Sequence, residues 1–352
     1  MEEKTLKFSA IVLLLLTIVT CVTLPYFPKI RVQREEAKEA QVAEEEYEAG
    51  QVEMNDLAII NTGGGTGSYG GKLSLRLPDG VSEEDIHFIN DYVTQTIQIT
   101  IPGTDEAYFA SHPVTGSSNH IDSLSYVQKG EQGLIEIVMD RVYEINTGYE
   151  NGSFYFDFLT PHEVYDKVVV IDAGHGGRAP GATKQGVNEK DIDLAIVLQL
   201  KKILEEQGQN IGVYYTRTDD SNPTFDQRVQ LANKSDADLF ISIHNNSTGN
   251  GRMSSASGTA VMYDEADETG MSQKLAEICA KEVTDVIGSR NRGIIEGDSI
   301  YIIRTSDVPV ALIEVGFMTN KEELRLLCSE DYQEKTATGI YNAILRAFEE
   351  GF

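Results

Sequence analysis

Three side chains in the second half of the chain have the types and positions for metal chemistry. His175 lies in an Asp-Ala-Gly-His-Gly-Gly turn that directly follows four β-branched residues, 168–171. His244 ends a second apolar run, and Glu189 opens the helix expected after the first strand. Because the carboxyl ends of strands in an open α/β sheet line one crevice, we expect these side chains to converge there. Two imidazoles and one carboxylate form a zinc-binding set that leaves a position open for water.

Glu314 is a fourth candidate, because it stands inside the apolar segment 310–315. Burying a carboxylate is costly unless it is paired, bound to a metal or protonated through a raised pKa. A structural interpretation is that Glu314 accepts hydrogen bonds at a strand end, or pairs with Arg217 or Arg304. A functional interpretation is that it is a general base, which takes a proton from metal-activated water and passes it to the leaving amine.

The elements that must position these residues alternate between strand and helix patterns from residue 167 onward, which is typical of an α/β domain. We expect strands at 168–171, 211–216, 238–244, 258–263, 300–304 and 310–315, and helices at 188–207, 224–232, 269–287 and 331–348, with a short one opening at 320. Asn188 and Thr224 are candidate helix caps, and Gly208 follows a helix end. The predicted fold is a mostly parallel or mixed twisted sheet flanked by helices.

Residues 72–163 differ from this domain, because apolar and polar residues alternate along several short segments. The pair Asn151-Gly152 is a strong two-residue hairpin signal. A short helix is expected to start at Ser82. The histidines of this region show no ligand spacing. We therefore predict a small β-rich module without chemistry of its own.

An apolar run from Phe8 to Phe27 precedes both regions. Its length suits a membrane span of about 20 residues and exceeds the apolar core of about 7–15 residues in a cleaved signal. We predict a membrane anchor in residues 1–28, with a cleaved signal as the alternative. Residues 29–71 form a charged and then glycine-rich linker, whose glycines lack the Lys-Ser/Thr ending of a phosphate loop.

Charge and cysteine content limit the partners of this 352-residue chain. It has 29 basic and 56 acidic residues, which give a net charge of -27. This balance argues against a nucleic acid partner. Three cysteines cannot build a disulfide framework.

Six ordered segments of residues 164–352 resemble the zinc-dependent N-acetylmuramoyl-L-alanine amidases. They stand at 168–177, 188–194, 215–219, 228–233, 237–246 and 309–320. The resemblance implies that His175, Glu189 and His244 hold one zinc ion and that Glu314 is the catalytic glutamate. It also implies hydrolysis of the amide between N-acetylmuramic acid and L-alanine in peptidoglycan, for wall remodelling, cell separation or spore cortex processing.

The same resemblance leads to expectations about place and partners. Because peptidoglycan lies outside the cytoplasmic membrane, the catalytic domain is expected outside, either membrane-anchored as a single-pass protein or secreted to the wall after signal cleavage. The catalytic domain is expected to be monomeric, with Asn246 touching the substrate peptide. The β-rich module resembles wall-targeting domains that precede some amidase domains, and a plain spacer is the alternative.

The sequence leads to further expectations about the openness of the cleft and about the residues around the His175 turn. Some relatives have a long insertion between the second histidine and the catalytic glutamate, with a helix that plugs the active site. Here the segment between His244 and the strand expected from Gly258 is short and rich in Ser, Gly and Asn, so we expect an open cleft. Asp172 either orients His175 or caps its turn, whereas Arg217 and Arg228 are expected to fix loops and helix starts.

Overall fold

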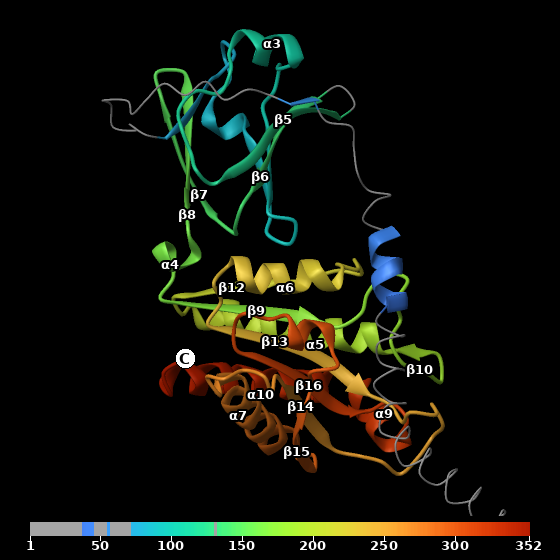
Figure 1. The fold of residues 1–352 in the computed structure, drawn as a ribbon. Helices are drawn as coiled ribbons and strands as arrows, with labels where there is room; N and C mark the ends of the chain where they lie inside the picture. Colours follow the sequence, from blue (N-terminus) through green and yellow to red (C-terminus); the bar gives the residue numbers. More distant parts are fainter. Residues whose placement is uncertain (1–36, 46–54, 57–71, 130–131) are drawn as a thin grey trace, which may run out of the picture.

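The computed structural model describes residues 37–45, 55–56, 72–129 and 132–352 (Figure 1). The predicted membrane segment, residues 1–28, lies outside the described residues, as does most of the predicted linker. Within the described ranges, no helix is long and apolar enough to cross a membrane.

A six-stranded sheet with the order β12-β9-β13-β16-β14-β15 forms the centre of the C-terminal half (Figure 1). Its strands are β9 (Lys167–Ala173), β12 (Ile211–Tyr215), β13 (Leu239–Asn246), β14 (Thr259–Tyr263), β15 (Asn291–Glu296) and β16 (Val310–Phe317). All neighbouring strands are parallel except β14 and β16, which pair antiparallel. The predicted mixed, mostly parallel sheet is confirmed.

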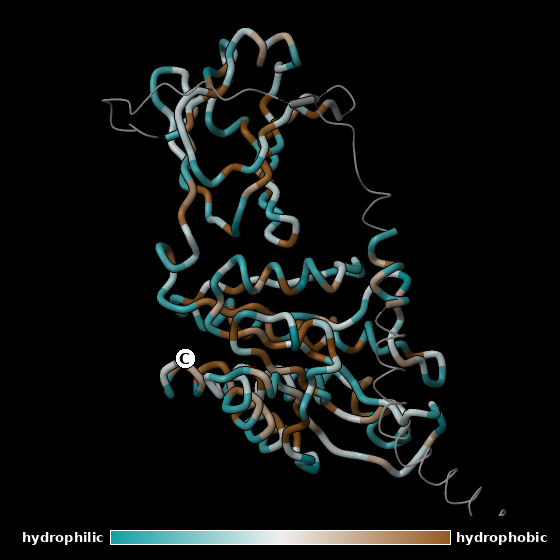
Figure 2. Tube along the Cα trace, in the orientation of Figure 1, coloured by the Kyte–Doolittle hydropathy of each residue, from teal (hydrophilic) through white to brown (hydrophobic). Residues whose placement is uncertain are grey.

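Helices cover both faces of this sheet, and Figure 2 shows hydrophobic residues concentrated between the layers. One face packs against α5 (Glu189–Gln207), α7 (Met271–Ile287) and α10 (Glu330–Glu349), and the other against α6 (Phe225–Lys234) and α8 (Tyr301–Arg304). The short helix α9 (Lys321–Leu327) follows β16, and the ribbon of β10 (Thr183–Lys184) and β11 (Val187–Asn188) precedes α5. The predicted caps are confirmed: α5 starts after Asn188, α6 starts after Thr224, and Gly208 ends α5 with a left-handed φ of 58°.

One predicted strand is wrong. Residues 301–304 form the helical turn α8, and the edge strand β15 was not predicted. The residues of β15 are exposed or half-buried, so its sequence lacks the apolar run that marks a central strand. Ile302 and Ile303 are consecutive and both buried, which suits one helical turn against a core, since a strand would point them to opposite faces.

On the face that α6 covers, three central strands change from apolar to polar toward their carboxyl ends. The rows are Val168, Val170 and Asp172 in β9, Phe240, Ser242 and His244 in β13, and Val310, Leu312 and Glu314 in β16. Alternate residues of a strand share one face. The polar members therefore lie beside one another: Asp172 pairs in register with Ser242, and His244 with Glu314. The sheet thus gathers the polar residues at one edge, beyond the apolar core.

Residues 55–56 and 72–159 form two antiparallel sheets above α6 (Figure 1). The first contains β1 (Asn55–Asp56), β5 (Ile121–Lys129), β6 (Gln132–Met139), β4 (Thr96–Thr100) and β3 (His87–Asp91); the second contains β2 (Leu73–Arg76), β8 (Ser153–Leu159) and β7 (Glu144–Glu150). Short helices are η1 (Glu83–Asp85), α3 (Glu106–Ser111) and α4 (Pro161–Val164). The predicted hairpin is confirmed, since Asn151 and Gly152 join β7 to β8 with φ angles of 53° and 73°.

This β-rich module packs directly on the catalytic domain. Val142 is buried in the hydrophobic core between α6 and the central sheet. Glu144 accepts hydrogen bonds from the hydroxyl of Tyr92 in the module (2.9 Å) and from that of Tyr214 in β12 (2.6 Å). The backbone N–H of Val142 also donates to the carbonyl of Lys234 at the end of α6 (3.1 Å). The module therefore completes the core of the α6 face.

Replacing Glu144 tests this docking. Glu144→Ala removes the acceptor of two tyrosine hydroxyls, and an unsatisfied buried polar group costs about 1–3 kcal/mol. We expect the free energy of unfolding of the purified chain, measured with urea, to fall by that amount. Glu150→Ala is the matched control, because Glu150 is an exposed residue of the same strand. Equal stability of the two variants would contradict the docking role.

Candidate metal centre

The structure brings His175, Glu189 and His244 together at the carboxyl edge of the sheet. Glu189 Oε1 lies 3.2 Å from His175 Nε2 and 3.3 Å from His244 Nδ1. Ligand atoms that surround one tetrahedral zinc at about 2.0–2.1 Å are roughly 3.4 Å apart. With Asp193, the donor atoms all lie within 4.8 Å of one another. The three predicted residues therefore fit a zinc ion in both donor type and spacing.

Two buried arginines hold the turn that carries His175. Arg228 donates to the carbonyls of Ala173 (2.7 Å) and His175 (2.6 Å). Arg217 donates to the carbonyls of Ala173 (2.9 Å) and Gly174 (2.7 Å). His175 itself has a φ of 58°, a conformation that side chains other than glycine adopt infrequently. The arginines thus stabilise an unfavourable backbone at the point where the histidine is presented.

A buried ion pair fixes Arg228 in turn. Asp172 Oδ1 lies 2.6 Å from Arg228 Nη1, and only 1% and 3% of these side chains are exposed. Asp172 also accepts hydrogen bonds from the hydroxyls of Thr216 and Ser242, both at 2.6 Å. Burial raises the pKa of Asp172, but the charge of Arg228 and the hydroxyls outweigh it and lower the pKa to about 2. Of the two predicted roles, the structure supports stabilisation of the turn, since Asp172 acts on His175 through Arg228.

Two glycines leave room for the ligand side chains. A Cβ atom on Gly174 would lie 2.4 Å from His244 Cε1. A Cβ atom on Gly181 would lie 2.6 Å from both Glu189 Oε2 and His175 Cδ2. These contacts are far shorter than van der Waals contact, so the glycines are needed because the ligand side chains pack directly against the backbone.

Glu189 is held by backbone groups as well as by the histidines. It is the first residue of α5 and is buried. Its Oε1 accepts from the N–H of Asn245 (2.9 Å) and its Oε2 from the N–H of Ala182 (2.7 Å). Burial raises its pKa, but the charges and hydrogen bonds of His175 and His244 outweigh that effect and hold the pKa well below its usual range. Glu189 is therefore a fixed anion.

Asp193 is a site residue that the sequence analysis missed. It lies one turn after Glu189 on α5, and its Oδ1 accepts a hydrogen bond from the side-chain amide of Asn245 (2.7 Å). Its Oδ2 is buried without a hydrogen-bond partner among the described residues. Burial and the negative charge of Glu189 raise the pKa of Asp193 well above its usual range. Glu189 and Asp193 stand four positions apart in one predicted helix, and this spacing is the sequence signal that could have identified Asp193.

The two asparagines after His244 have different surroundings. Asn245 is buried and links Asp193 to Glu189, through its side chain and its backbone N–H respectively. It therefore has no face left for substrate. Asn246 is half-buried, and its predicted contact with the substrate peptide stays a prediction.

Glu314 lies beside His244 on the neighbouring strand β16. Its Oε2 is buried without a hydrogen-bond partner, and no salt bridge of Glu314 occurs in the described part of the chain. Glu314 therefore does not pair with Arg217 or Arg304, and that structural interpretation is wrong. Burial and the negative charge of Glu189 raise the pKa of Glu314 to about 8. An unpaired carboxyl group beside a metal-binding set is available for proton transfer.

The open cleft that the sequence suggests stays a prediction. Residues 247–258 contain no helix, as expected from their composition. A helix at residues 37–45, which we call the N-terminal helix, places the carboxylate of Glu39 3.2 Å from His175 Nδ1. The sequence analysis did not consider this helix, because it lies far from the site residues in sequence.

The C-terminal half of the chain is similar to known proteins. Residues 169–346 match the family model described as N-acetylmuramoyl-L-alanine amidase. The chain is 40% identical over 178 residues to the uncharacterised protein YqiI of Bacillus subtilis, covering 51% of this chain and 83% of that protein. It is 33% identical over 198 residues to the germination-specific N-acetylmuramoyl-L-alanine amidase of the same organism, covering 52% and 81%. An N-acetylmuramoyl-L-alanine amidase structure from Clostridium difficile 630 aligns at 34% identity with a TM-score of 0.49, over 53% of this chain and 98% of that one.

Replacing Asp172 tests the dependence of the turn on its ion pair. Asp172→Ala leaves Arg228 buried and uncompensated, which costs about 3–5 kcal/mol. We expect this loss in the free energy of unfolding at neutral pH, and partial recovery in the double variant Asp172→Ala/Arg228→Met. Because the pKa of Asp172 is lowered from 3.8 to about 2, its contribution is present above pH 4 and is lost as the pH falls through about 2. A variant as stable as wild type at pH 7 would contradict this role.

Proposed function

This chain belongs to the N-acetylmuramoyl-L-alanine amidase family of peptidoglycan hydrolases, and we propose that His175, Glu189 and His244 hold its catalytic zinc while Glu314 transfers protons. The amide hydrolysed joins N-acetylmuramic acid to L-alanine of the stem peptide. The observation that carries the residue assignment is the placement of Glu189 Oε1 within 3.2 and 3.3 Å of the two imidazole nitrogens. Three donors at this spacing suit one zinc ion.

The unpaired carboxyl group of Glu314 supports its role as general base and acid. Zinc, when bound, would polarise the scissile carbonyl and increase the acidity of the attacking water. Glu314 accepts a proton from that water and then donates it to the leaving nitrogen. Without a metal, burial and the negative charge of Glu189 raise the pKa of Glu314 to about 8, and a zinc ion bound nearby would lower that pKa and favour the carboxylate that acts as the base. Its Oε2 has no competing hydrogen-bond partner among the described residues.

Fixed groups around Glu189 and His175 orient these two proposed zinc ligands. Asn245 and Ala182 donate to Glu189 and keep its carboxylate in one position. Arg228 and Arg217 hold the turn of His175 through its carbonyls. Such support keeps ligands in the geometry that catalysis needs without reorganisation.

The place of action is part of the same proposal. Residues 8–27 form an apolar run that is broken only by small or hydroxyl residues, and such a run suits a single membrane span. We propose that it holds the catalytic domain on the outer side of the cell membrane, where peptidoglycan lies. Release to the wall after signal cleavage is the alternative, and fractionation of cells with an antibody to the catalytic domain separates the two.

A two-metal zinc exopeptidase is the competing enzyme class. Such enzymes need a second cluster of metal-ligating residues, whereas the described chain holds a single such group, formed by His175, Glu189, Asp193 and His244. We expect elemental analysis of the purified protein to give one zinc ion per chain. Two zinc ions per chain would favour the exopeptidase.

The role of Glu314 is tested with defined muropeptides. We expect Glu314→Gln to lower kcat by at least about 100-fold, because loss of a general base costs about 10²–10⁴-fold, while one zinc ion per chain is retained. Mass spectrometry should show free stem peptides with the wild-type enzyme and with the control variant, and far fewer with Glu314→Gln. Glu322→Gln is the matched control, because Glu322 is an exposed residue of α9. Undiminished cleavage by Glu314→Gln would remove Glu314 from the mechanism.

A further inference from the structure

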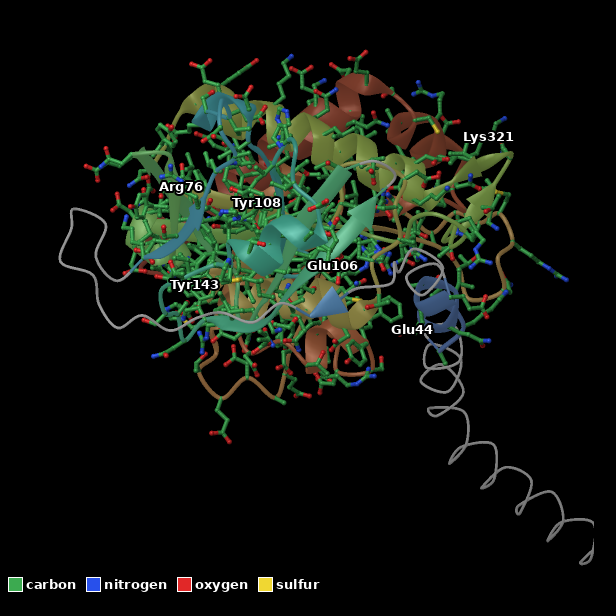
Figure 3. All side chains as sticks on the ribbon, turned by 90° about the horizontal axis from the view of Figure 1, so that it is seen from above. Glu44, Arg76, Glu106, Tyr108, Tyr143 and Lys321 are labelled. Carbon is green, nitrogen blue, oxygen red and sulfur yellow. The ribbon has the colours of Figure 1, made fainter. Side chains whose placement is uncertain are left out.

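The N-terminal helix packs against the turn that carries His175, although it lies outside both the β-rich module and the catalytic domain in sequence (Figure 1). Figure 3 shows the same helix from above, with Glu44 labelled. Its inner face is formed by Glu39, Ala40, Val42 and Ala43, of which Ala43 is 2% exposed. Arg178 of the catalytic domain donates to the carbonyl of Val42 (3.4 Å) and pairs with Glu45 (3.6 Å). The helix is thus seated on the site by packing and by polar contacts.

Glu39 and Glu189 face opposite nitrogens of the same imidazole ring. Both oxygens of Glu39 lie 3.2 Å from His175 Nδ1. Glu189 Oε1 lies 3.2 Å from His175 Nε2. Only 13% of the His175 side chain and 27% of the Glu39 side chain are exposed, so water competes weakly for this contact.

The chemistry of imidazole determines what this arrangement does. A neutral imidazole carries one N–H, and only its other nitrogen can bind a metal. An ionised carboxylate only accepts hydrogen bonds, so Nδ1 of His175 must carry the proton that Glu39 accepts. Nε2 is then the nitrogen left for the metal, and in the metal-free chain a proton on Nε2 is accepted by Glu189, whose Oε1 lies 3.2 Å away. Metal-binding histidines commonly donate their outer N–H to a carboxylate in this manner, which fixes the tautomer and the ring orientation.

We propose that Glu39 is a positioning residue of the metal centre, which the N-terminal helix supplies to the catalytic domain. It holds His175 in the tautomer and orientation that present Nε2 to the metal. The proposal rests on the assignment of His175 as a zinc ligand.

Other contacts of His175 do not replace this one. Arg217 and Arg228 bind carbonyl groups of the turn and hold the backbone, so they leave rotation of the ring unrestricted. Among the described residues, Glu39 and Glu189 are the hydrogen-bond partners of the ring nitrogens. Without Glu39, Glu189 is the remaining acceptor, and it favours a proton on Nε2, the nitrogen that must be bare to bind zinc. Zinc would then bind only the fraction of molecules in which Nε2 is bare.

The first measurement uses the metal-free protein. The chain has six histidines, and ¹⁵N NMR of histidine-labelled protein, assigned with a His175→Ala variant, distinguishes the Nδ1–H and Nε2–H tautomers. We expect a proton on Nδ1 of His175 in wild type and loss of the Nδ1–H signal in Glu39→Ala, in which the proton stays on Nε2 beside Glu189. Glu44→Ala is the matched control, because Glu44 is an exposed residue of the same helix, and it should keep the wild-type spectrum.

The second measurement is zinc affinity, by competition with a chelator. Loss of an outer hydrogen-bond partner lowers metal affinity about 10–100-fold, so we expect this loss in Glu39→Ala and no loss in Glu44→Ala. Glu39→Gln should be intermediate, because its amide oxygen accepts the same hydrogen bond without the charge. A helix that only stabilised the fold would not produce this order of zinc affinities.

Two results would overturn the proposal. Unchanged tautomer and zinc affinity in Glu39→Ala would show that the contact positions nothing. Higher amidase activity of Glu39→Ala with unchanged zinc affinity would show that the N-terminal helix blocks the cleft instead. Failure of the proposed function is distinguishable, because wild type itself would then bind no zinc or release no stem peptides.

Discussion

The buried ion pair between Asp172 and Arg228 is the interaction on which the site depends. It joins β9 to α6, and the hydroxyls of Thr216 and Ser242 extend it to the neighbouring strands. Arg228 then binds the carbonyl of His175. A charge taken out of water is tolerated only when it is fully paired and hydrogen-bonded. The ion pair is therefore stable although it is buried, and it links the sheet rigidly to the turn that presents His175.

The central sheet also explains how groups from both of its faces meet at the site. His244 and Glu314 continue the α6 face of adjacent strands, whereas Asn245 points to the opposite face and contacts Asp193 of α5. Glu189, at the start of α5, reaches the edge between these faces. One short stretch of β13 thus supplies a candidate ligand on one face and its support on the other. The N-terminal helix supports the site from a third side, because Glu39 contacts Nδ1 of His175.

Residues at or near the carboxyl ends of buried strands could be predicted from the sequence, because strand ends in α/β sheets converge by topology. His175, His244 and Glu314 are of this kind, and Glu189 follows from its helix start. Glu39 could not be predicted: it stands 136 positions before His175, in a run where many glutamates have the same local surroundings. Asp193 was missed because it lies on a helix face that only tertiary packing identifies as part of the site. The strand β15 was missed because an exposed edge strand lacks an apolar run.

The most direct test of the account is a crystal structure of the zinc-loaded protein, with anomalous scattering measured on both sides of the zinc absorption edge. The account predicts a single zinc peak, bonded to His175 Nε2, Glu189 and His244 Nδ1, with Glu39 at His175 Nδ1 and Asp193 not bonded to the metal. A peak at other residues, a second zinc ion, or zinc bonded to His175 through Nδ1 would contradict it.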